Sequence, residues 1–120
     1  MEISSTHLRY LVAIYEISQK TPDVCSASVA NRMQVSKPSV ARMLVTPMKK
    51  QLIVKELYGK IYLTDKGFLL ACEFDQKVRL LTERIPRMGL RLTEEEIDTA
   101  ACAMAAAFIN ANPDAERKNE

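Results

Sequence analysis

A short break between two amphipathic segments constrains the fold of this chain more than any other feature. Residues 26–33 carry apolar side chains at intervals of three and four residues, which is typical of a short helix, and a second helix starts soon afterwards at Ser36-Lys37-Pro38. Serine is a favoured N-cap, and a proline in the first turn lacks only an N–H that would have no partner in the helix. Two short helices joined in this way predict a helix-turn-helix, whose second helix covers about residues 37–50.

The segments on either side of this pair predict a mainly α-helical fold with one small β-hairpin. Residues 6–17 carry an apolar stripe wide enough to face a core, and Pro22 follows the end of the helix that they form. Residues 52–64 contain two short runs of β-branched and aromatic side chains around Gly59, which is typical of a hairpin. Because a two-stranded hairpin is not stable alone in water, we expect it to pack against the helices as a wing.

Pro47 is the residue that fits this scheme least. Inside a helix, proline removes a backbone hydrogen bond and its ring clashes with the carbonyl four residues earlier, at a cost of about 3 kcal/mol. We therefore expect the helix to kink or to end near Thr46, with residues 48–51 forming a looser turn. A helix that reaches its ordinary C-terminus at this point is the alternative.

Two further helices follow the hairpin, and they differ in composition. The first stops before Pro86, and the second starts at Thr93, where Glu96 has the spacing of a capping box. Residues 100–107 of the second helix are mostly alanine, the best helix former, and such small side chains let another helix approach closely. We expect these two helices to pair with those of a second copy, with one core helix of a monomer as the alternative.

These elements divide the chain into three parts. Residues 1–66 are predicted to form a winged helix-turn-helix with its wing at about 52–64, and residues 67–110 a helical dimerisation region. Residues 111–120 are polar and are expected to be a disordered tail.

The formal net charge of +2 conceals an asymmetry along the chain. Residues 1–66 contain ten Lys or Arg against five Asp or Glu, whereas residues 67–120 contain seven against ten. Residues 31–66 alone contain eight basic side chains and two acidic ones. A basic excess confined to one part indicates a nucleic-acid surface there, although a solvated charged face has the same composition.

The composition argues against several other classes of protein. No apolar run approaches the ~20 residues that cross a bilayer and no signal peptide is recognisable, so we expect a cytoplasmic protein without a membrane span. The three cysteines Cys25, Cys72 and Cys102 are far apart and form no C-x-x-C pair, which favours reduced, buried thiols. With three glycines, a single histidine at His7 and no nucleophile–base set, the sequence predicts no enzyme and no cofactor.

Two motifs are specific when they are taken together: Val-Ser-Lys-Pro-Ser-Val at residues 35–40 and Leu-Thr-x-x-Gly at residues 63–67. With the apolar residues around them, they resemble the iron- and manganese-dependent repressors of bacteria and archaea, the diphtheria-toxin-repressor family. The match is close over roughly residues 8–72 and looser beyond. The resemblance implies a homodimeric winged-helix repressor that binds double-stranded DNA and is activated by a divalent metal.

The metal ligands of that family are missing from this sequence. Divalent manganese and iron need carboxylate and imidazole donors, and only a cysteine persists at the matching positions. We therefore expect no metal site, with a soft metal at Cys102 and Met104 or a different ligand as alternatives. The family's ligand positions fall on Arg9, Val12, Val78, Cys102, Ala105 and Ala106.

The resemblance also implies which side chains meet DNA. Hydroxyls near helix starts bind phosphate, lysines neutralise phosphates, and Arg42 can reach a guanine or a phosphate. Ser26 is in addition the predicted N-cap of its helix. The full set is Ser26, Ser28, Ser36, Lys37, Pro38, Ser39, Arg42, Lys49, Lys50, Lys55 and Lys60.

The function expected from these arguments is a dimeric, sequence-specific transcriptional regulator, a repressor that has lost metal control. A winged-helix module whose basic face engages an acidic protein partner is the alternative. Exposed polar side chains on the second helix of the helix-turn-helix favour DNA, whereas an exposed apolar patch there would favour a protein.

Overall fold

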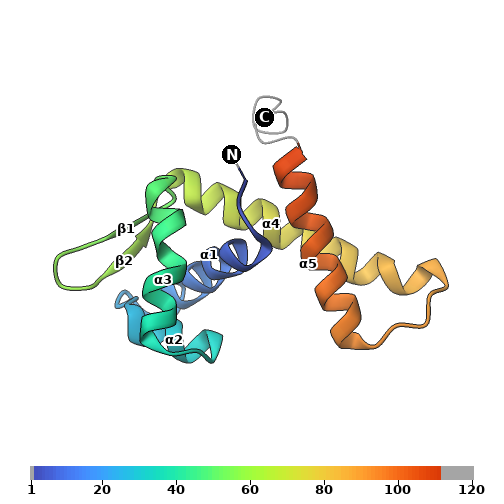
Figure 1. Ribbon diagram of the computed structural model, residues 1–120, viewed down its shortest axis with the longest axis horizontal. Helices are drawn as coiled ribbons and strands as arrows, with labels where there is room; N and C mark the ends of the chain where they lie inside the picture. Colours follow the sequence, from blue (N-terminus) through green and yellow to red (C-terminus); the bar gives the residue numbers. More distant parts are fainter. Residues whose placement is uncertain (1, 112–120) are drawn as a thin grey trace. The chain divides into compact units, whose positions relative to one another are not determined.

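The computed structural model describes residues 2–111, and its elements follow the predicted order (Figure 1). The predicted fold, mainly α-helical with one small β-hairpin in a winged-helix arrangement, is confirmed. The predicted tail lies outside the described residues except for Ala111, which ends the last helix. The elements are α1 (Ser5–Ser18), α2 (Ser26–Met33), α3 (Lys37–Lys49), β1 (Ile53–Lys55), β2 (Ile61–Leu63), α4 (Asp65–Arg84), the 3-10 helix η1 (Ile85–Met88) and α5 (Glu94–Ala111).

The chain forms two compact units. The winged-helix unit is Thr6–Cys72, and the α5 unit combines Met1–Ser5 with Glu73–Glu120. Helix α4 contributes its first residues to the winged-helix unit and the remainder to the α5 unit.

The core of the winged-helix unit is built from apolar side chains of every element in it. Helix α1 supplies Leu8, Leu11 and Ile14, whose spacing of three residues places them on one face. Burying a side chain of this size contributes roughly 1.5–3 kcal/mol, so this face largely determines where α1 packs. The other large side chains that are almost fully buried in this unit are Val29, Val40, Leu44, Pro47, Leu52 and Ile61.

The turn between α2 and α3 is closed by backbone geometry. Gln34 adopts a left-handed conformation with φ of 58°, and its backbone N–H donates to carbonyls of the last turn of α2. The N–H of Val35 donates to the Ala30 carbonyl at 3.0 Å. Ser36 then caps α3, because its Oγ accepts the backbone N–H of Ser39 at 3.2 Å. The predicted start of α3 is therefore confirmed.

The start of α2 differs from the prediction. Cys25 is the N-cap residue and Ser26 is the first helical residue, so Ser26 does not cap the helix. Ser28 supplies the hydrogen bonds instead, since its Oγ accepts the N–H of Cys25 at 2.9 Å and donates to the Cys25 carbonyl at 2.9 Å. A hydroxyl three residues inside the helix can reach back to the cap residue, as in a capping box, and residue type alone does not distinguish the two registers.

Pro47 does not end α3 near Thr46, contrary to the prediction. The helix continues to Lys49, and Pro47 is almost completely buried. Two residues before the helix end, proline removes a single hydrogen bond, and its carbonyl still accepts the N–H of Leu52 at 2.9 Å. Burial of the ring in the core offsets the lost bond, so the alternative of a tolerated helix C-terminus describes α3 better.

The wing is a short antiparallel hairpin that is held at its base. Ile53 pairs with Leu63 and Lys55 with Ile61, and both isoleucines are about 2% exposed. The N–H of Ile61 also donates to the Val24 carbonyl at 2.9 Å, which ties β2 to the segment before α2. The wing therefore packs on the helices as expected.

A very close backbone approach joins the wing to α4. The Leu52 carbonyl accepts the N–H of Thr64 at 3.0 Å, and Thr64 Oγ1 accepts the N–H of Gly67 at 3.0 Å. A Cβ at position 67 would lie 1.9 Å from the Leu52 oxygen. Only glycine fits there.

The α5 unit is closed by a side-chain amide. Asn110 Oδ1 accepts the N–H of Ile3 at 2.9 Å, and its Nδ2 donates to the carbonyls of Ile3 at 2.8 Å and Ala106 at 2.9 Å. The predicted capping box is confirmed, since Glu96 accepts the N–H of Thr93 and Thr93 accepts that of Glu96. The small side chains of α5 are partly covered within the chain, because Ala101, Cys102, Ala105, Ala106 and Ile109 are buried.

Gly67→Ala is expected to destabilise the protein by about 3 kcal/mol, because a methyl group cannot share the space of the Leu52 carbonyl. Urea denaturation of the purified variant measures this loss. Gly59→Ala is the control, since Gly59 has a positive φ of 87° but nothing within 4 Å of an added Cβ, and about 1 kcal/mol of backbone strain is expected there. Equal losses in the two variants would contradict the importance of the close approach.

Candidate nucleic-acid interface

Helix α3 has one buried face and one open face. Val40, Leu44 and Pro47 are buried in the core. On the opposite side, exposed residues follow one another at intervals of three and four, and we call this surface the α3 ridge. The α3 ridge consists of Pro38, Ala41, Arg42 and Val45.

A chain of hydrogen bonds runs along the first turn of α3. Ser36 Oγ lies 2.9 Å from Ser39 Oγ, and Arg42 Nη2 donates to Ser39 Oγ at 3.2 Å. The guanidinium of Arg42 is thereby drawn toward the N-terminus of the helix while the residue stays exposed. Arginine has further N–H donors in a fixed fork, and these remain for an external acceptor. Lys37 is exposed beside this turn.

The two serines at the start of α2 are less available to phosphate than predicted. Ser26 and Ser28 are both half-buried, and the hydroxyl of Ser28 is engaged with Cys25 on both its donor and acceptor sides. The backbone N–H groups of Ala27 and Ser28 in the first turn of α2 donate to the sulfur of Cys25, so they are engaged inside the protein.

Cys25 is more exposed than expected. Of the three cysteines, which are all free, only Cys102 is buried. The pKa of the Cys25 thiol is lowered, chiefly because the backbone N–H of Ser28 donates to the sulfur, and to a smaller extent by the Ser28 hydroxyl, the N–H of Ala27 and the charge of Lys37, while burial acts in the opposite direction. The surroundings of Cys25 therefore stabilise the negatively charged thiolate.

The lysines lie at two places around the α3 ridge. Lys49 is exposed and Lys50 is half-buried at the end of α3, where burial and then the charge of Lys50 lower the pKa of His7. Lys55 and Lys60 are exposed on the wing. Lys60 Nζ lies 3.6 Å from Asp23 Oδ1, an exposed ion pair of the kind that contributes about 0–1 kcal/mol.

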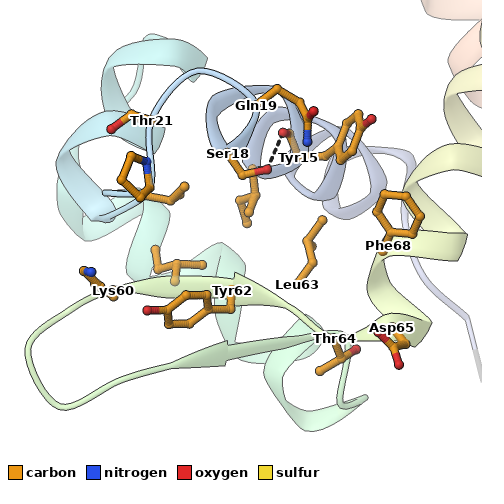
Figure 2. Close-up of a pocket in the computed structure, with 14 residues that line it drawn as sticks. Tyr15, Ser18, Gln19, Thr21, Lys60, Tyr62, Leu63, Thr64, Asp65 and Phe68 are labelled. Atoms are coloured by element: carbon orange, nitrogen blue, oxygen red, sulfur yellow. Dashed lines mark hydrogen bonds between the residues drawn. The ribbon is translucent and has the colours of Figure 1, made fainter.

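An open cavity of about 440 Å³ lies between the C-terminal turn of α1, strand β2 and the start of α4. Figure 2 shows the side chains that line it. Tyr15 and Phe68 form one side of it, with ring centroids 5.4 Å apart. Several polar groups on its wall are used inside the protein: Ser18 Oγ donates to the Tyr15 carbonyl, and Thr64 Oγ1 donates to the Gln51 carbonyl.

The residues at the family's metal-ligand positions do not fit a divalent metal. Arg9 is exposed, Val12 and Val78 are half-buried, and the remaining three positions are buried. Valine and alanine have no donor atom, and arginine repels a cation. In residues 2–111, no three His, Cys, Asp or Glu side chains are grouped so that they could hold a metal ion.

The prediction from sequence missed Ala41 and Val45. Both lie on the α3 ridge, and Val45 is 42% exposed. The helical period that starts at Pro38 indicates both positions, but Pro38 is the single apolar residue in the predicted set. Apolar residues on an open helix face can meet a thymine methyl group as well as a protein.

Two solved structures are similar to this chain. The metal-dependent transcriptional regulator MtsR superposes with a TM-score of 0.69 at 29% sequence identity, over 88% of this chain and 50% of the other. The manganese regulator SloR superposes with a TM-score of 0.68 at 28% identity, over 88% of this chain and 47% of the other. The chain therefore spans about half the length of these structures. No family model matches it, and no curated protein sequence does.

The resemblance to the diphtheria-toxin-repressor family is thereby confirmed, since both of these structures are of regulators from that family. One is a manganese regulator and the other a metal-dependent transcriptional regulator, whereas only Cys102 among the matching positions here carries a donor atom for a metal. Among residues 2–111, no helix is long and apolar enough to cross a membrane.

Ser36→Ala is expected to lower the free energy of unfolding by about 1 kcal/mol, because the N–H of Ser39 loses its capping acceptor. Thermal or urea denaturation measures the change. Ser18→Ala is the matched control, since that exposed hydroxyl only donates to a carbonyl near the end of α1, and a change within about 0.5 kcal/mol is expected. A Ser36 variant as stable as the native protein would show that the cap contributes nothing.

Proposed function

We propose that this chain is a dimeric, sequence-specific DNA-binding regulator of transcription, a repressor that acts without a bound metal. The observation that carries the proposal is the exposed α3 ridge beside the hydrogen-bonded chain of Ser36, Ser39 and Arg42 in the first turn of α3. The similarity to two transcriptional regulators over 88% of the chain supports it.

In the proposed complex, α3 lies in the major groove, which is roughly 12 Å wide and admits one helix. Arg42 donates to guanine O6 and N7, or to a phosphate. Pro38, Ala41 and Val45 are the apolar side chains that can contact thymine methyl groups. The hydroxyls of Ser36 and Ser39 and the ammonium of Lys37 bind the phosphates beside the groove.

The remaining lysines contribute affinity for DNA that does not depend on the base sequence. Lys49 and Lys50 at the end of α3, and Lys55 and Lys60 on the wing, neutralise phosphates and release counterions. The affinity for DNA should therefore fall steeply as the salt concentration rises. The hydroxyl of Ser26 at the start of α2 binds a further phosphate.

The homodimer is supported by apolar side chains that the α5 unit leaves exposed. Leu80 is 53% exposed, Met88 64%, Leu90 56% and Phe108 49%. Exposed apolar surface of this kind is typical of an interface, and a two-fold dimer presents the same surface twice. Two copies would place two α3 ridges on two half-sites.

Selection of bound DNA from a random pool, with and without a chelator, tests the proposal. We expect one enriched sequence with two-fold symmetry, because a dimer presents two identical α3 ridges. We expect the same sequence and affinity in both arms, because the family's ligand positions carry no carboxylate or imidazole donor.

A tenfold rise in affinity on adding manganese or iron, or tight metal uptake in calorimetry, would contradict the metal-free proposal. An asymmetric enriched sequence would contradict the dimer. Failure to enrich any sequence would contradict DNA recognition and would favour the protein-interaction module. The exposed side chains of Val35, Val45 and Met48 would then supply the apolar contacts with a protein partner.

Arg42→Ala is expected to weaken binding to the selected sequence by about 1–3 kcal/mol and to leave binding to random DNA nearly unchanged. Fluorescence anisotropy with both DNAs measures the two effects. Arg91→Ala, an exposed arginine in the loop before α5, is the matched control for charge. Equal losses on both DNAs would show that Arg42 contacts only the backbone.

A further inference from the structure

The tip of the wing carries two large apolar side chains that are almost fully exposed. Leu57 is 90% exposed and Tyr58 93%, the highest values among large hydrophobic residues in the described part of the chain. Val54 and Tyr62, which pair across the hairpin, are also 50% and 42% exposed. The outer end of the wing is therefore an apolar surface and not only a basic one.

The turn that displays these side chains is closed by backbone hydrogen bonds. The N–H of Glu56 donates to the Lys60 carbonyl at 2.7 Å, and the N–H of Gly59 donates to the Glu56 carbonyl at 2.9 Å. Gly59 takes up the positive φ of 87° that this turn requires. Leu57 and Tyr58 thus project from a hydrogen-bonded turn, at little further entropic cost on binding.

The charges around the tip complement a polyanion, and the exposed ion pair of Lys60 with Asp23, at 3.6 Å, is weak enough for a phosphate to replace it. Lys55 at the end of β1 and Lys60 just before β2 are both exposed and flank the two apolar residues. The single acidic residue between them, Glu56, accepts a hydrogen bond from the Tyr62 hydroxyl at 3.2 Å. Its carboxylate is therefore drawn back along the hairpin, away from Leu57 and Tyr58.

We propose that the wing tip enters the minor groove of DNA beside the α3 site, with Leu57 and Tyr58 against the groove floor and the sugars. Lys55 and Lys60 then meet the phosphates of the two opposite rims. The proposal rests on the DNA-binding function proposed above and adds a second element that reads the sequence.

The dimensions of the minor groove admit the side chains of the wing tip but not the hairpin itself. The minor groove is about 6 Å wide, and the two strands of a hairpin are already about 4.8 Å apart before their side chains are counted, so only tip side chains can enter. Apolar wedges of this kind are used by proteins that bind the minor groove.

Minor-groove contact has a specific chemical consequence. Guanine presents a 2-amino group on the minor-groove floor, whereas an A·T pair presents only acceptors. The amino group occupies the space that an apolar tip would fill and leaves its N–H donors without a partner. The wing should therefore prefer A·T pairs at the flanking positions that it contacts.

Inosine substitution in the flanks of the selected sequence tests this proposal. An I·C pair has the major-groove groups of G·C but lacks the 2-amino group, so its minor groove resembles that of A·T. We expect binding to weaken about tenfold when the flanks change from A·T to G·C, and to recover when they change to I·C. The protein is the full chain, and affinity is measured by fluorescence anisotropy.

The double variant Leu57→Ser, Tyr58→Ser should bind all three flanks with the weaker affinity and should keep its preference for the central sequence. Both side chains are exposed, so the variant is expected to fold normally, which a thermal unfolding curve verifies. Lys60→Ala is the control: it should reduce the dependence of log K on log salt by about one and keep the flank preference.

Equal binding of G·C and I·C flanks, both weaker than A·T, would assign the preference to the major groove and overturn the proposal. So would a double variant that retains the native flank preference. Either result leaves recognition of the central sequence intact, whereas loss of all sequence preference in the native protein would overturn both proposals.

Discussion

The contact between the Leu52 carbonyl and the start of α4 is the constraint on which the winged-helix unit depends. That carbonyl accepts the N–H of Thr64 and lies where a side chain of residue 67 would have to be. The same short stretch ends α3, begins the wing and receives the returning strand. Because backbone atoms cannot yield as side chains do, this junction fixes the direction of the wing relative to α3, and with it the spacing between the two proposed DNA contacts.

The order and type of the elements could be predicted from the sequence because local signals agreed. Apolar periodicity, a capping serine before a proline, and a glycine between β-branched runs each depend on a few neighbouring residues. The capping box of α5 was predicted for the same reason, since its two partners are three residues apart. Such signals need no knowledge of the tertiary structure.

The wrong predictions concern features that depend on tertiary packing or on the exact residue at which a helix starts. Pro47 was expected to kink α3 or to end it near Thr46, but its ring is buried in the core and the helix continues to Lys49. Ser26 was expected to cap α2, but Cys25 takes that position and Ser28 reaches back to it. The proposed interface was predicted through its serines, its basic residues and Pro38. Ala41 and Val45 were not predicted, because the exposure of small apolar side chains depends on which helix face the core covers.

The hydrogen bonds of Asn110 have a consequence for the order in which the chain folds during synthesis. Residues 6–72 are continuous in sequence, so the winged-helix unit can form as soon as they have left the ribosome. The hydrogen-bond partner of Ile3 is Asn110, which lies 107 residues later in the chain and is therefore translated much later. Until α5 is made, the N–H of Ile3 lacks the acceptor that it has in the folded protein. A nascent chain would thus present a formed helix-turn-helix before the α5 unit is assembled.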